Sequence, residues 1–140
     1  MSESTSFHLR LQQQIDCQLE VNARQSLINW ESLGWNEEPG TDSDEAPLKY
    51  LALVLLDALE SKAVRINIDK DNGPTVYADT TYTLPKAPTS FIARGLEILR
   101  DISGMEGASS KGRIAVGLRS ESLEIVIQKD GGLHTITILY

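Results

Sequence analysis

Short runs in which apolar and polar residues alternate dominate the second half of this 140-residue sequence. A period of two places all the apolar side chains of a run on one face of a β-strand. The runs predict strands at 64–68, 75–83, 114–118, 123–127 and 133–139, the last two joined by a turn at 129–132. Strands with one apolar face need a sheet whose apolar face is covered by other elements.

Apolar residues at helical spacing predict two helices that can cover this sheet. The first is expected at 47–62, because Pro47 suits a first turn and apolar residues follow every three or four positions. The second is expected from a cap at Thr89 or Ser90 to about residue 103. The order helix, strand, strand, helix, strand, strand, strand predicts an α+β fold with a mixed or antiparallel sheet packed by helices.

Residues 7–21 are compatible with two structures. Their apolar residues all lie at odd positions, which is the period of a strand, although fifteen residues are long for one strand. On a helical wheel the same apolar residues, Leu9 excepted, fall within an arc of about 200°. We favour the strand and keep the helix as the alternative. After this segment, Asn22 is expected to cap a helix at 22–34.

An acidic segment separates this N-terminal part from the rest of the chain. Five acidic residues lie within nine positions, namely Glu37, Glu38, Asp42, Asp44 and Glu45. Such a composition has too few apolar groups to offset the entropy of ordering, so we predict an acidic linker at 36–46. The alternative is an acidic patch that recruits a basic partner. The chain then divides into an N-terminal extension at 1–35, the linker, and an α+β domain at 47–140.

The composition limits the classes of function. The net charge is -7, which on average repels nucleic acid and anionic membranes. One cysteine excludes an internal disulfide. The longest apolar run, residues 51–56, is far shorter than the roughly 20 residues of a membrane span, and the N-terminus lacks the features of a signal peptide. We therefore expect a cytoplasmic protein with no membrane insertion and no nucleic-acid partner.

The sequence contains no convincing phosphate, metal or thiol site. The segment 107–112 has small residues but lacks the order of a phosphate-binding loop, Gly-x4-Gly-Lys-Ser/Thr. His8 and His134 lie near opposite ends of the chain, and Cys17 has no ligand at metal-binding spacing. Cys17 with His134 would be the only thiol–imidazole pair. However, Cys17 lies at one of the odd, apolar positions of residues 7–21, where a small buried residue is the usual explanation.

Two aspartates and two tryptophans have structural explanations in the sequence. Asp69 and Asp71 lie at a turn, where aspartates commonly accept hydrogen bonds from the backbone. Trp30 is expected in the core and Trp35 over the exit of its helix, rather than on a partner surface. We therefore expect no catalytic residue, no bound cofactor and no metal, and a protein that is not an enzyme.

The segment from Asp44 to Asp69, DEAPLKYLALVLLDALESKAVRINID, resembles part of the bacterial type II secretion and type IV pilus assembly ATPases. In that family an acidic residue and Ala-Pro precede a helix, and a Lys/Arg-Ala-Ser-Asp-Ile-His-Ile-Glu strand follows it. Leu84-Pro85, residues 91–102, Lys111-Gly-Arg-Ile114 and the last two strands are similar to the family in the same order. The resemblance covers about residues 44–140 and implies the fold of the N-terminal domain that precedes the ATPase core.

Departures from the family concern charge. Arg65 and Asn67 stand where the family has Asp and His. Asp79 lies in the segment where the family has an Arg-x-Arg-x-Asp-Gly strand. Val126 occupies the position at which the family has an arginine on a later strand. In the family such arginines help this domain approach the nucleotide, and an aspartate there would repel phosphate. Since the sequence ends at Tyr140, where the family continues into a RecA-like core, we expect the N-terminal fold without its motor.

The resemblance implies a non-catalytic protein-interaction domain, an adaptor or regulator of a type II secretion or type IV pilus system. Its expected partner is a protein such as the ATPase of that system. The last predicted strand is expected to be exposed and to pair with another chain, which also allows a homodimer. The alternative is a small acidic cytosolic export chaperone, which would expose an apolar groove and bind one specific client.

Overall fold

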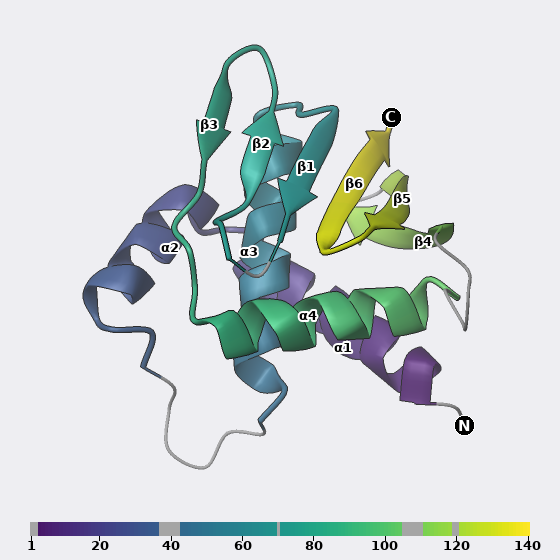
Figure 1. The fold of residues 1–140 in the computed structure, drawn as a ribbon, viewed down its shortest axis with the longest axis horizontal. Coiled ribbons are helices and arrows are strands. Elements are labelled where there is room, and N and C mark those ends of the chain that lie inside the picture. The colour runs from purple at the N-terminus through teal and green to yellow at the C-terminus, as the bar shows by residue number, and fades with distance from the viewer. Residues whose placement is uncertain (1–2, 37–42, 70, 105–110, 119–120) are drawn as a thin grey trace.

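The computed structural model describes residues 3–36, 43–69, 71–104, 111–118 and 121–140 (Figure 1). Its helices are α1 (Glu3–Gln18), α2 (Ala23–Ser32), α3 (Glu45–Glu60) and α4 (Thr89–Ile102). Its strands are β1 (Arg65–Ile68), β2 (Thr75–Tyr77), β3 (Thr81–Thr83), β4 (Lys111–Leu118), β5 (Glu121–Asp130) and β6 (Leu133–Leu139). All strand pairs are antiparallel, in the order β3-β2-β1-β6-β5-β4. The protein has the predicted α+β fold, and the sheet is antiparallel.

Residues of the sheet alternate between a row that packs against the helices and a row that is more exposed. Ile66 of β1 pairs with Ile136 of β6, which pairs with Ile127 of β5, and all three are buried. They belong to one hydrophobic cluster with the helices, in which α3 is buried along nearly its whole length. The alternate residues Arg65 and Thr137 lie in the neighbouring row of the same strands and are exposed or half-buried. This alternation confirms the predicted strand period.

Residues 7–21 do not form the strand that we favoured. Most of them belong to α1, in which Leu11 and Ile15 are fully buried and Phe7 packs against the core. A spacing of four residues satisfies both a period of two and a helical period, so the pattern alone does not separate them. Leu9, the residue outside the helical arc, is 59% exposed. Cys17 is also exposed, so its interpretation as a small buried residue was wrong.

The next helices begin close to the predicted positions. Asn22 caps α2 as expected, since its side-chain oxygen accepts a hydrogen bond from Gln25 N at 3.0 Å. Helix α3 begins at Glu45, and Asp44 before it accepts hydrogen bonds from Arg94 at 2.7 and 3.1 Å. The predicted linker at 36–46 therefore overlaps the start of α3, while residues 37–42 lie outside the described ranges. Both α1 and α2 pack into the same core as α3.

Three local predictions were wrong, the first being the turn at 129–132, since β5 extends through Lys129 to Asp130. Residues 75–83 form two strands rather than one, with a turn in which Ala78 N donates to Thr80 O at 3.3 Å. This turn contains Asp79 but neither glycine nor proline, so the turn signal in the sequence is weak there. Helix α4 begins at Thr89 after Pro88, which occupies the cap position without a side-chain capping bond. Neither Thr89 nor Ser90 is therefore the cap.

The last strand is not exposed, contrary to our expectation. Strand β6 lies in the middle of the sheet, between β1 and β5, because the chain crosses from β3 through α4 to the far edge and then returns. The edge strands are β3 and β4. The outer edge of β4 is occupied: Arg113 N donates to Ser103 O, His8 Nε2 donates to Ala115 O, and the Gln12 amide bonds to Gly117 N and O. An exposed final strand is therefore no route to pairing with another chain.

No helix within the described part of the chain combines the length and the apolar character that a membrane span requires.

Candidate functional site

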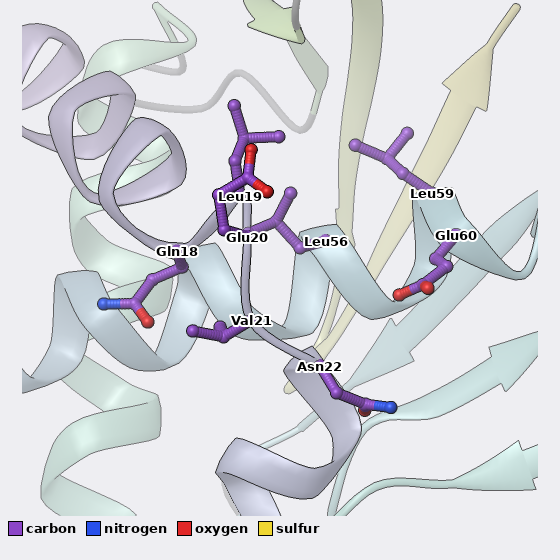
Figure 2. A pocket seen from close by; sticks show the side chains of 8 residues that line it. All are labelled: Gln18, Leu19, Glu20, Val21, Asn22, Leu56, Leu59 and Glu60. Atoms are coloured by element: carbon purple, nitrogen blue, oxygen red, sulfur yellow. The ribbon is translucent and has the colours of Figure 1, made fainter.

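An open groove lies where α1 ends, α2 begins and α3 ends (Figure 2). Its volume is about 550 Å³, and we call it the α1–α3 groove. Leu56 and Leu59, one turn apart on α3, are nearly buried, whereas Val21 is 43% exposed. The residues that line the groove are Gln18, Leu19, Glu20, Val21, Asn22, Leu56, Leu59 and Glu60. The groove thus combines apolar and polar side chains in its lining.

The α1–α3 groove has a negative electrostatic character. The carboxylates of Glu20 and Glu60 line it, and both α1 and α3 end beside it without a basic residue in the last turn. Carbonyl groups at a helix C-terminus carry partial negative charge, so these two ends add to the field of the carboxylates. A segment that contains an apolar side chain next to a lysine or arginine is complementary to this surface.

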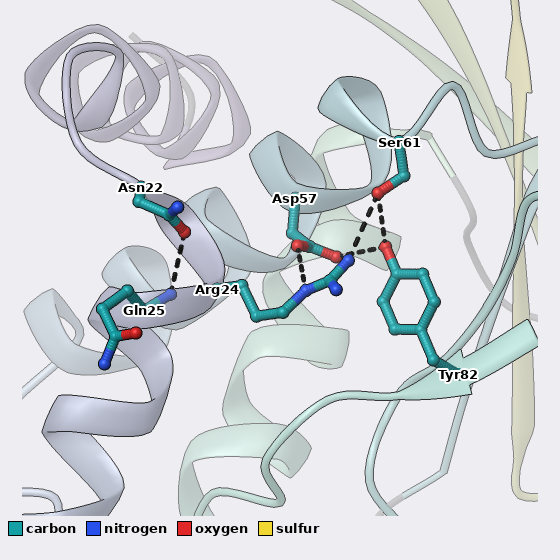
Figure 3. Close-up of polar contacts among 6 residues, drawn as sticks. All are labelled: Asn22, Arg24, Gln25, Asp57, Ser61 and Tyr82. Atoms are coloured by element: carbon teal, nitrogen blue, oxygen red, sulfur yellow. Dashed lines mark hydrogen bonds and ion pairs between the residues drawn. The ribbon is translucent and has the colours of Figure 1, made fainter. Parts of the chain in front are cut away.

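A buried polar cluster connects α2, α3 and β3 (Figure 3). Asp57 of α3 is 3% exposed and accepts hydrogen bonds from Arg24 Nε at 3.0 Å and from the Tyr82 hydroxyl at 2.6 Å. Ser61 Oγ lies 2.7 Å from the Tyr82 hydroxyl, and the Arg24 guanidinium lies 4.1 Å from the Tyr82 ring centroid. Each polar group in the cluster therefore has a partner, as a buried carboxylate requires.

The protonation of this cluster suits a structural role. Burial and the hydrogen bond to the Asp57 carboxylate raise the pKa of Tyr82 above its usual value. The Tyr82 hydroxyl therefore stays protonated over the whole neutral range and donates a hydrogen bond to the Asp57 carboxylate. The cluster holds α2 and β3 against α3, and the sequence did not single out any of its members.

Asp69 has the structural role that the turn suggested. Its Oδ1 accepts hydrogen bonds from Asp71 N at 2.8 Å and Asn72 N at 2.7 Å. Hydrogen bonds from the side chain and backbone of Asn72 lower the pKa of Asp69, because they stabilise the carboxylate. Asp71 itself is exposed at the surface. The two aspartates form a turn and not a pair of reacting carboxylates.

The tryptophans also lie where we expected them. Trp30 is 8% exposed, and its ring centroid lies 5.2 Å from that of Trp35 and 5.6 Å from that of Phe91 on α4. Trp35 is half-buried and lies edge-on to Tyr50 of α3 at 5.6 Å. This aromatic cluster joins α2 to α3 and α4. Core packing is therefore the confirmed role of Trp30.

The structure does not bring Cys17 and His134 into contact. Cys17 is exposed on α1, whereas His134 is 5% exposed on the packed face of β6, where neither ring nitrogen has a hydrogen-bond partner among the described residues. Within the described ranges, no group of three His, Cys, Asp or Glu side chains is arranged to hold a metal ion. Of the segment 107–112, residues 107–110 lie outside those ranges.

His134 predicts a pH dependence of stability. Burial, with smaller effects of Arg100 and Lys129, lowers the pKa of His134 below its usual value. The His134 imidazole therefore binds a proton more readily in the unfolded chain than in the folded protein. The free energy of unfolding is consequently expected to fall as the pH drops below about 6.5. His134→Leu should remove this dependence, which urea unfolding at about pH 7.5 and about pH 5.5 would measure. The control His8→Gln should retain it; an unchanged dependence in His134→Leu would contradict the assignment.

The positions that depart from the secretion ATPase pattern lie apart from the α1–α3 groove. Arg65 and Val126 belong to one row of the sheet, in which each pairs with Thr137; Arg65 is exposed and Val126 is buried. The Arg65 guanidinium lies 4.3 Å from the ring centroid of Tyr77, and Asp79 is exposed in the turn between β2 and β3. No protein-family model and no curated protein matches the chain.

Proposed function

We propose that this protein is a non-catalytic protein-interaction domain that acts as an adaptor or regulator of a type II secretion or type IV pilus ATPase system in the cytoplasm. The observation that carries protein binding is the α1–α3 groove, which combines apolar side chains with an acidic margin. The choice of partner rests on the resemblance of residues 44–140 to the N-terminal domain of those ATPases.

The chemistry of the groove defines the segment that it accepts. Leu56 and Leu59 line it and suit an aliphatic side chain, while Glu20 and Glu60 suit a lysine or arginine one or two turns away. The partner is therefore a folded protein that presents a basic amphipathic segment. Carboxylates are common catalytic groups, but two of them are engaged in contacts within the fold. Asp57 accepts a hydrogen bond from the Tyr82 hydroxyl, and Asp44 accepts one from Arg94.

The groove also favours a second candidate function, that of an export chaperone. Val21 is 43% exposed beside the nearly buried leucines, so an unfolded client has an apolar surface to contact. The two functions differ in the state of the partner: a chaperone co-purifies with one unfolded client, whereas an adaptor binds a folded ATPase.

Charge reversal in the groove tests the proposal. Purified protein is mixed with candidate secretion and pilus ATPases, and complexes are measured by pull-down and by titration. Glu20→Lys and Glu60→Lys should each weaken binding about tenfold, because a lysine repels the basic segment of the partner. Asp101→Lys on α4, an exposed residue, makes the same change of charge and should bind normally. Absence of any complex, or equal weakening in all three variants, would contradict the proposal.

A further inference from the structure

The outer edge of β3 is open, unlike that of β4. Leu84 N donates to Pro74 O at 2.8 Å and Ala78 N to Thr80 O at 3.3 Å, so the even-numbered residues of β3 direct their backbone groups toward β2. The backbone groups of Thr81 and Thr83 consequently point away from the sheet. In the described ranges, no residue outside β2 hydrogen-bonds to this strand's backbone.

The open edge is short and has defined limits. Pro85 lacks an N–H group, and its carbonyl oxygen accepts a hydrogen bond from the Tyr50 hydroxyl at 2.8 Å. The free edge therefore ends at Thr83 on one side and at the β2–β3 turn on the other. A strand that pairs with it needs only two residues with outward-facing backbone groups, and an antiparallel β3 of another copy supplies these.

A shallow groove continues the edge beyond Thr83. Its volume is about 480 Å³, and its walls are α2 and the chain segment after β3, with Arg24, Ile28 and Lys86 among its lining residues. Figure 1 shows α2 on the β3 side of the molecule, away from β4. Arg24 is already paired with Asp57, so Lys86 is the cation in this lining that can pair with a carboxylate of another copy.

The charges at the two ends of β3 are complementary under a two-fold axis. Asp79 is exposed in the turn before β3, and Lys86 is exposed beyond its other end. In an antiparallel pair centred on Tyr82, Thr81 lies opposite Thr83 of the second copy, and Asp79 reaches the end of the second copy where Arg24 and Lys86 line the groove. The same contact then forms twice, as a two-fold interface requires.

We propose that a second copy of this chain docks antiparallel on β3, so that the two sheets become continuous and each β2–β3 turn enters the shallow groove between α2 and Lys86 of the other copy. Thr81 and Thr83 exchange backbone hydrogen bonds with their counterparts, and Asp79 pairs with Lys86 of the second copy. Because the edge is short, the interface is smaller than that of an obligate dimer, and the dimer dissociates on dilution. This surface is separate from the α1–α3 groove, so the dimer and partner binding are tested independently.

A charge swap tests the pairing in the full chain. Sedimentation velocity over a wide range of concentrations should show a monomer–dimer equilibrium for the unchanged protein. Asp79→Lys and Lys86→Glu should each weaken the dimer about tenfold, and the double variant should restore it, since the swapped charges attract again. Asp101→Lys is the matched control and should dimerise normally.

Cysteine pairs test the register. In a Cys17→Ser background, Thr81→Cys and Thr83→Cys proteins should form a disulfide-linked dimer when mixed and oxidised, and much less of it when each is oxidised alone. A protein that stays monomeric at every concentration would overturn the proposal. A dimer whose affinity is unchanged in the charge variants, or whose cysteine variants crosslink equally alone and mixed, would also overturn it. Such a dimer would use another surface or another register.

Discussion

Trp30→Ala is expected to lower the free energy of unfolding by about 3–5 kcal/mol, the usual cost of deleting a buried tryptophan. Trp30 is 8% exposed and contacts Trp35 and Phe91, so its removal leaves a cavity between α2 and α4. The lost volume cannot be refilled easily, because its neighbours are rigid rings on separate elements. Urea unfolding followed by far-UV circular dichroism measures the change, since tryptophan fluorescence itself is altered.

Two further variants calibrate this result. Trp30→Phe keeps much of the ring and should cost clearly less than the alanine variant. Trp35→Ala should also cost less, because Trp35 is half-buried at the exit of α2. A loss below about 1 kcal/mol for Trp30→Ala, or equal losses for both tryptophans, would contradict a core role for Trp30.

Asp57→Ala is expected to lower the free energy of unfolding by about 2–4 kcal/mol. The substitution removes the acceptor for both Arg24 Nε and the Tyr82 hydroxyl. Arg24 is partly exposed, so water can replace its lost hydrogen bond. Most of the lost stability therefore comes from the unpaired Tyr82 hydroxyl and from the cavity that the Asp57 side chain leaves. The measurement is urea unfolding at neutral pH, with an unchanged dependence on urea as the sign of an intact fold.

The control for Asp57 is an exposed aspartate. Asp101→Ala on α4 should change stability by less than about 0.5 kcal/mol. A double-mutant cycle with Tyr82→Phe should give a coupling of about 1 kcal/mol or more, because the two side chains are 2.6 Å apart and hydrogen-bonded. Additive losses in the cycle would show that the cluster does not act as a unit.

The N-terminal segment shows why periodicity alone did not decide one element. Leu11 and Ile15 are four residues apart, a spacing that both a strand and a helix place on one face. Packing against α3 selects the helix, because a helix there buries these residues and also lets His8 and Gln12 hydrogen-bond to the outer edge of β4. The information that decides α1 therefore lies outside its own segment, in α3 and in β4.

The candidate surfaces could not be located from the sequence for the same reason. The α1–α3 groove brings residues 18–22 beside residues 56–60, and the buried cluster brings Arg24 and Asp57 beside Tyr82. Neither set has a motif, since its members are common residue types at unrelated spacings. By contrast, the roles of Asp69 and Trp30 were predictable, because a turn and a helix face are local features.

The sequence by itself determined the α+β class, the positions of most strands and helices, and the core role of α3, because these depend on the period of apolar residues along a short stretch of chain. Only the tertiary structure decided that α1 is a helix, that β6 is central, and that β3 is the open edge. Those outcomes depend on which elements contact one another in the folded chain. The alternation of apolar and polar residues within one strand does not show which distant strand it pairs with.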